Sequence, residues 1–128
     1  MRILLDTHTL LWWLDGDARL PAKVREVIGD PKNEILVSAA SAIEITTKFR
    51  IGKLPGAAAV AADVAQSVAS QAFLPLSISL VHAERAGRLP GPHRDPFDRL
   101  LAAQCQSEDL PVVSADAVFD TYGVTRLW

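Results

Sequence analysis

Short apolar runs alternate along the chain with longer segments in which apolar residues recur every three or four positions. The runs at 2–5, 35–37, 73–76 and 110–113 have the length and flanks of strands buried on both faces of a parallel sheet. The helical pattern predicts further elements between these strands, at 10–19, 21–28, 38–51, 57–72, 79–88 and 96–105. A short helix and a final strand are expected around Phe119, Val124 and Leu127.

Strands that alternate with helices predict an α/β fold, with a central, mainly parallel sheet of four or five short strands and helices on both faces. The length of 128 residues suits one domain that spans 1–128. No internal repeat, linker or low-complexity tract divides it.

The composition narrows the class of protein further. With 49% hydrophobic and 22% charged residues, the chain is typical of ordinary globular domains. Asp6 and His8 interrupt the N-terminal apolar stretch, so it is not a signal peptide, and no segment reaches the roughly 18–20 uncharged residues of a membrane span. The lone cysteine, Cys105, cannot form an internal disulfide and is expected to be buried. A cytoplasmic protein without a membrane partner is therefore predicted.

Two acidic residues follow predicted strands directly. Asp6 comes after the first strand, and Asp116 follows the 110–113 strand by two small residues, Ser114 and Ala115. The carboxyl ends of parallel strands form one edge, where ligands bind near the point at which the strand order reverses. Two carboxylates at one edge repel each other, so the pair predicts a divalent cation between them.

Glu44 and Asp98 have alternative structural interpretations. Ser41 and Glu44 match a capping box, in which the glutamate bonds a backbone amide at a helix start. Asp95 can cap the helix that begins at Pro96, which puts Asp98 in a first turn favoured by the helix dipole. Because both helices follow segments that end at the same sheet edge, their first turns can also bring Glu44 and Asp98 beside Asp6 and Asp116.

Four motifs carry a resemblance to a known family: ILLDTH at 3–8, SAASAIEI at 38–45, HRDPFDRLLAAQ at 93–104 and VSAD at 113–116. The whole chain resembles PIN domains, specifically the VapC-type toxin ribonucleases of type II toxin–antitoxin pairs. The resemblance implies a PIN-like three-layer α/β/α fold. It also implies cleavage of RNA phosphodiesters, a homodimer, and a protein antitoxin that blocks the site.

The resemblance places the metal-binding and catalytic acids on Asp6, Glu44, Asp98 and Asp116, with Asp95 at a flanking position. It implies Mg²⁺ or Mn²⁺ as cofactor, and carboxylate oxygens suit such hard cations. A carboxylate-bound cation lowers the pKa of bound water, so metal-activated water is the expected nucleophile.

Some neighbours of these acids are expected to orient the carboxylates, and others are expected to contact the substrate. Thr7 and Ser114 can orient a carboxylate, although turn and cap bonding explains them as well. The net charge of −2 excludes binding of nucleic acid by bulk electrostatics, so any RNA contact must be local, and Arg94, Arg99 and Lys48 are the candidates. The alternative is that these side chains form a solvated face or that the arginines form a salt bridge to Asp95. His8 and His93 are expected to be structural, and Trp12 and Trp13 to pack in the core or a dimer.

Two other functions compete. A receiver-like phosphoacceptor domain has a similar length and acidic edge, but it would need adjacent acids after the first strand, where this chain has Thr7 beside Asp6. A non-catalytic PIN-like binding protein is the second, and the complete set of four acids argues against it.

Overall fold

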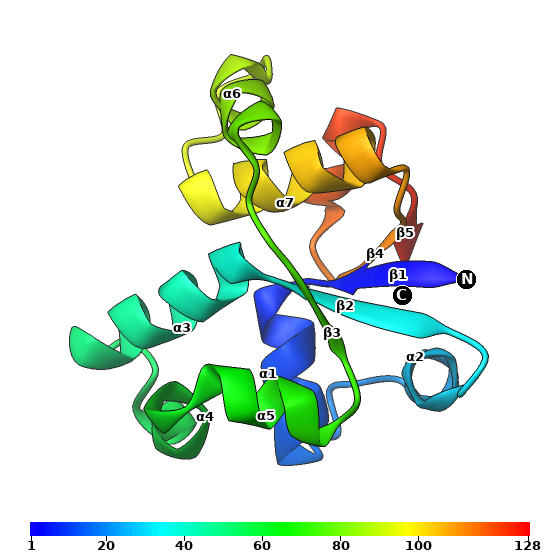
Figure 1. Cartoon of the computed structure of the whole chain (residues 1–128), viewed down its shortest axis with the longest axis vertical. Helices are drawn as coiled ribbons and strands as arrows, with labels where there is room; N and C mark the ends of the chain where they lie inside the picture. The colour runs from blue at the N-terminus through cyan, green and yellow to red at the C-terminus, as the bar shows by residue number, and fades with distance from the viewer.

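The computed structural model describes residues 1–128, and its centre is a sheet of five parallel strands. The strand order is β3-β2-β1-β4-β5 (Figure 1). The strands are β1 (Arg2–Leu5), β2 (Glu34–Ser38), β3 (Leu74–Leu76), β4 (Val112–Val113) and β5 (Arg126–Leu127). The predicted α/β fold with a parallel sheet is confirmed, with five strands.

Helices cover both faces of this sheet. Figure 1 shows α6 and α7 on one side, and α1, α2, α4 and α5 on the other. The α-helices are α1 (Thr7–Asp15), α2 (Ala22–Gly29), α3 (Ala39–Arg50), α4 (Ala58–Ala62), α5 (Val64–Ser70), α6 (Leu80–Arg88) and α7 (Pro96–Glu108), and two 3₁₀ helices are η1 (Pro55–Ala57) and η2 (Ala117–Tyr122). No helix combines the length and the apolar character needed to cross a membrane.

Strand β1 supplies both halves of the core because successive side chains of a strand point to opposite faces. Ile3 and Leu5 lie in one apolar cluster with residues of α1, α2 and α5, whereas Leu4 lies in another with residues of α7. All three side chains are fully buried. Cys105 belongs to the second cluster, and burial raises the pKa of its thiol to about 12, so it is an inert packing residue, as expected.

The helix predicted over 57–72 is wrong in one respect, because the structure breaks it into η1, α4 and α5. Asp63 lies at the break with non-helical backbone angles (φ −159°, ψ 82°), and its carboxylate accepts a hydrogen bond from the Gln66 amide at 3.0 Å. Aspartate competes for backbone amides in this way and so favours helix starts over helix interiors. The periodic valines around it could not reveal the break.

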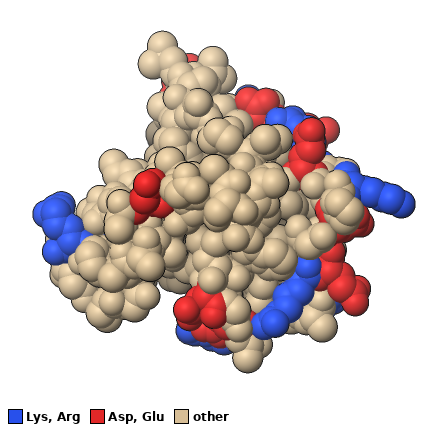
Figure 2. All heavy atoms as spheres, turned by 60° about the horizontal axis from the view of Figure 1, so that its bottom comes forward, with Lys and Arg blue, Asp and Glu red and all other residues tan.

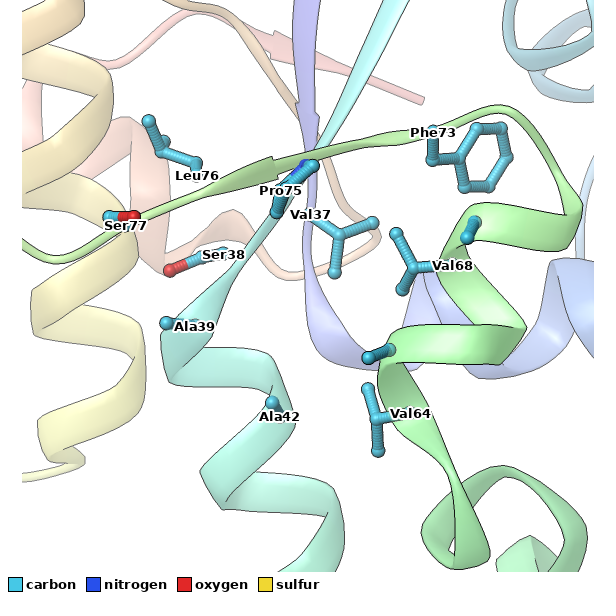
Figure 3. Close-up of a pocket in the computed structure, with 12 residues that line it drawn as sticks. Val37, Ser38, Ala39, Ala42, Val64, Val68, Phe73, Pro75, Leu76 and Ser77 are labelled. Carbon is cyan, nitrogen blue, oxygen red and sulfur yellow. The ribbon is translucent and has the colours of Figure 1, made fainter.

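The side of the molecule that carries α4 and α5 is almost free of charge. Between Lys53 and Glu84 the only acidic or basic residue other than histidine is Asp63. Figure 2, which turns the lower side of Figure 1 forward, shows a broad area with few charged side chains and a charged rim. An apolar groove of about 260 Å³ lies among α3, α5 and β3, lined by Val37, Val64, Val68, Phe73 and Pro75 among others (Figure 3).

A test of this packing compares two leucines. Leu4→Ala removes a fully buried side chain between two layers and is expected to lower the free energy of unfolding by about 2–5 kcal/mol in urea denaturation. Leu80→Ala, at a side chain that is 87% exposed, is the control and is expected to change it by less than about 0.5 kcal/mol. Equal effects would contradict the assignment of β1 as the central strand.

Candidate active site

The strand order reverses between β1 and β4, since the chain adds β2 and β3 on one side of β1 and β4 and β5 on the other. Asp6 follows β1 and Ser114 follows β4 at this point. The Ser114 hydroxyl donates a hydrogen bond of 2.5 Å to Asp6 Oδ2, which joins residues 108 positions apart. The two segments that sequence analysis expected at one edge therefore meet there.

Asp6 is held rigidly. Its side chain is the N-cap of α1 and accepts a 2.8 Å hydrogen bond from the Thr9 amide, while the Thr9 hydroxyl donates to the carbonyl of Val113. The residue is only 7% exposed. Burial raises the pKa of the Asp6 carboxyl, although the hydrogen bonds from Ser114 and Thr9 oppose the shift. Thr9 was not singled out from the sequence, and only its position three residues after an N-cap could have pointed to it.

Asp116 is tied to Asp6 through Ser114. Its backbone amide donates a 2.9 Å hydrogen bond to the Ser114 hydroxyl, which also serves Asp6. Its carboxylate caps η2 by accepting from the Val118 amide at 2.9 Å and is exposed to solvent. Ser114 therefore fixes the relative positions of two of the four acids.

The capping-box interpretation of Ser41 and Glu44 is wrong. The N-cap of α3 is Ser38, whose hydroxyl accepts from the Ala40 amide at 3.0 Å, because the helix begins as soon as β2 ends. Ser41 is therefore inside the helix, where it accepts a 2.9 Å hydrogen bond from the Thr7 hydroxyl. Thr7 thus binds α3 to the end of β1 and is not bonded to a carboxylate.

Glu44 lies in the second turn of α3, not the first turn that the sequence predicted, and is 4% exposed. Its carboxylate forms an ion pair with Lys48, one turn later in the same helix. Burial alone would lower the pKa of Lys48, but the hydrogen bond to Glu44 and the charges of Asp95 and Asp98 outweigh burial and raise it. The spacing of four between Glu44 and Lys48 was the sequence signal for this pair.

Asp95 and Asp98 take the positions expected at the start of α7. Asp95 is the N-cap and accepts hydrogen bonds from the amides of Phe97 (2.9 Å) and Asp98 (3.3 Å), with Pro96 in the first turn. Asp98 Oδ2 lies 3.0 Å from His93 Nε2, a contact that sequence analysis missed. Burial, followed by the negative charge of Asp95, raises the pKa of Asp98 to about 6, and Asp116 and Glu44 add to the repulsion.

The donor set suits a hard divalent cation, because carboxylate oxygens dominate it and their mutual repulsion is what a cation relieves. No three His, Cys, Asp or Glu side chains are close enough to form a finished metal cage. The carboxylate side chains therefore fit Mg²⁺ or Mn²⁺ chemically. In this structure Glu44 and Asp98 are held by Lys48 and His93.

The two arginines near Asp98 differ in their surroundings. The Arg99 guanidinium donates to the backbone carbonyls of Ala86, Leu89 and His93, so it fixes the loop between α6 and α7 and has no salt bridge to Asp95. This structural role was not foreseen. Arg94 is exposed and carries no ion pair, which leaves its charge available to a ligand.

The chain was compared with protein families and with curated proteins. The model of the PIN domain family matches residues 3–124, whereas the chain matches none of the curated proteins. The five-strand order also differs from the 2-1-3-4-5 order of receiver domains, which argues against that alternative.

Three solved structures share the fold over nearly the whole chain. VapBC2 of Rickettsia felis bound to promoter DNA is 16% identical, with a TM-score of 0.72 and coverage of 99% of this chain and 98% of its own. The sarcin–ricin loop cleaving toxin VapC20 of Mycobacterium tuberculosis is 19% identical, with a TM-score of 0.68 and 96% of both chains covered. DNA-bound VapBC of Salmonella typhimurium is 17% identical, with a TM-score of 0.67 and coverage of 99% and 97%.

The raised pKa of Asp98 predicts a pH-dependent cost to folding. Its folded-state pKa of about 6 exceeds its ordinary value of 3.8, so the folded state loses stability as pH rises from about 4 to 6, and the full cost is present above pH 6. In EDTA, Asp98→Asn is therefore expected to raise the free energy of unfolding by about 1–3 kcal/mol at pH 7.5, with the gain shrinking toward pH 4.

Urea denaturation measures the free energy of unfolding of Asp98→Asn, and Asp17→Asn is a control that should change this free energy in the opposite direction. Hydrogen bonds from Arg19 lower the pKa of the partly exposed Asp17 carboxyl to about 2, so its contribution is present above about pH 4 and is lost as pH falls toward 2. Its replacement should lower stability at pH 7.5. A loss of stability in Asp98→Asn at pH 7.5 would contradict the predicted repulsion.

Proposed function

Because the chain belongs to the PIN domain family, we propose that it is a metal-dependent endoribonuclease and the toxin of a type II toxin–antitoxin pair. The observation that carries the proposal is the link from Asp6 to Asp116 through Ser114 at the reversal point of the sheet, together with the repulsion of Asp98 by Asp116 and Glu44. The fold shared with the VapC20 toxin and with two VapBC complexes supports it.

The four acids would hold Mg²⁺ or Mn²⁺. When bound, such a cation lowers the pKa of water to give a nucleophile at neutral pH and neutralises charge on the scissile phosphate. Ser114 and the Thr9 amide fix both oxygens of Asp6, and Asp95 fixes the first turn of α7 and with it the position of Asp98. The protein thus contributes an array of oriented carboxylates.

Basic side chains at the rim would contact RNA. Lys48 lies beside Glu44 and within the electrostatic reach of Asp95 and Asp98, and exposed Arg94 precedes the cap of α7 by one residue. Both can bind phosphates next to the acids. Arg99 supports Arg94 indirectly by fixing the loop that carries it.

The proposed partners are a VapB-type antitoxin and a second copy of the chain in a cytoplasmic homodimer. The antitoxin is supported by the VapBC complexes among the similar structures. The side over α4 and α5, which is almost free of charge, is a suitable surface for protein contact.

Cleavage of defined RNAs tests the activity. Asp6→Asn and Asp98→Asn are each expected to reduce Mg²⁺-dependent cleavage by at least about 100-fold, because each removes a charged donor from the cluster. Glu84→Gln, on the exposed surface of α6, is the control and should cleave as the wild type does. Wild-type rates in both aspartate variants would overturn the proposed mechanism.

Metal binding can be tested without activity. Mn²⁺ or Mg²⁺ should raise the melting temperature of the wild type, because a ligand that binds only the folded state stabilises it, and EDTA should reverse the rise. Asp6→Asn should show a smaller rise at the same concentrations. An unchanged melting temperature of the wild type in millimolar Mn²⁺ would count against a metal site.

A further inference from the structure

Three aromatic rings form a group, tilted to one another by 38° and 54°, that the proposed chemistry does not use. The His8 and Trp12 rings have centroids 6.0 Å apart, and those of Trp12 and Trp128 are 5.8 Å apart. The Arg19 guanidinium lies 4.9 Å from the centre of the Trp12 ring. His8 and Arg19 are exposed, and both tryptophans are partly buried.

This aromatic cluster, His8, Trp12 and Trp128, starts next to Asp6 in the chain. His8 follows Asp6 by two residues in the first turn of α1, and Trp12 lies one turn further. Trp128 follows β5, which pairs with the strand that leads to Ser114. The cluster therefore extends from the proposed reaction site along the side of the sheet covered by α1 and α2.

A hollow of about 260 Å³ continues the cluster beyond Trp128. Its walls are aliphatic side chains of α2 and of the ends of β4 and β5, together with the Trp128 ring. Lys23 and Arg126 also line it, and Lys23 has no ion pair in the structure. An aromatic ring, apolar walls and the unpaired cation of Lys23 are thus brought together, while Arg126 is paired with Asp120.

The chemistry favours single-stranded RNA as the occupant. Lysine is depleted at protein–protein interfaces, whereas the unpaired Lys23 lines the hollow beside Trp128 here. Aromatic faces stack on every nucleobase, and basic groups that follow the backbone hold phosphates. A chain with a net charge of −2 also needs contacts that do not depend on bulk electrostatics to hold a polyanion.

We propose that His8, Trp12 and Trp128 form a stacking platform for RNA bases that flank the scissile phosphate, with the unpaired Lys23 holding the adjacent backbone. The placement beside the cleavage site rests on the proposed ribonuclease function. Stacking on Trp12 and Trp128 would position the strand without touching the reacting atoms.

Adjacent tryptophans provide a matched test. Trp12 lies in the aromatic cluster, whereas Trp13 packs on Phe73 and donates to Gln71 at 3.0 Å on another side of α1. A single-stranded RNA of mixed sequence carrying 2-aminopurine is titrated in EDTA with the wild type, Trp12→Leu and Trp13→Leu. The fluorescence of 2-aminopurine falls when it stacks, so it reports stacking as well as affinity.

Trp12→Leu is expected to weaken binding roughly tenfold and to abolish the quenching, because loss of one stacking partner has an effect of that size. Trp13→Leu should bind as the wild type does, and Trp12→Tyr should restore the quenching. If Trp12→Leu does not fold by circular dichroism, His8→Ala and Lys23→Gln, at exposed positions, test the same surface.

Equal binding by the wild type and Trp12→Leu, or equal losses in both leucine variants, would overturn the platform. So would a Trp12→Leu variant whose only change is a shift in sedimentation from dimer to monomer, which would assign the cluster to a second copy. If the wild type cleaves RNA but Trp12→Leu binds the RNA unchanged, the proposed function stands and the platform is overturned. If the wild type quenches 2-aminopurine but cleaves no RNA, the platform stands and the proposed ribonuclease function is overturned.

Discussion

The parallel pairing of β1 with β4 is the constraint on which the rest of the molecule depends. It joins the start of the chain to residues more than 100 positions later, and it sets the reversal point of the strand order between these two strands. Because β1 is buried on both faces, its side chains hold the two helical layers together and its carboxyl end fixes Asp6. The same pairing therefore determines both the core and the position of the first acid.

The acids at this edge oppose the stability that the core provides. Asp6 and Glu44 are almost fully buried, and Asp98 is repelled by three neighbouring carboxylates. The fold offsets the cost with local donors: Ser114 and Thr9 for Asp6, Lys48 for Glu44 and His93 for Asp98. Such a concentration of buried charge is a hallmark of functional sites, since packing alone would favour apolar residues there.

The sequence predicted the sheet, the position of Asp6 and the cap at Asp95, because each depends on a local pattern: an apolar run, a strand end, an aspartate before a proline. It could not show the break at Asp63, where a side chain competes with the helix backbone. The helix start at residue 38 was predicted correctly, but Ser41 also suits an N-cap, and only the end of β2 selects Ser38 over it. The contacts of Thr7 with Ser41 and of His93 with Asp98 depend on tertiary geometry and leave no sequence signal.

Helix α1 shows how one short element can serve both the fold and the proposed substrate. Its buried threonines bind neighbouring segments, Thr7 to α3 and Thr9 to the end of β4, and so hold the helix start against the acids. Its other positions present His8 and Trp12 beside Trp128. An acidic protein with an acidic reaction site repels a polyanion at long range, so contacts at short range must supply the attraction. Aromatic stacking is such a contact, and the rigid attachment of α1 to the acids would transmit its register to the cleavage site.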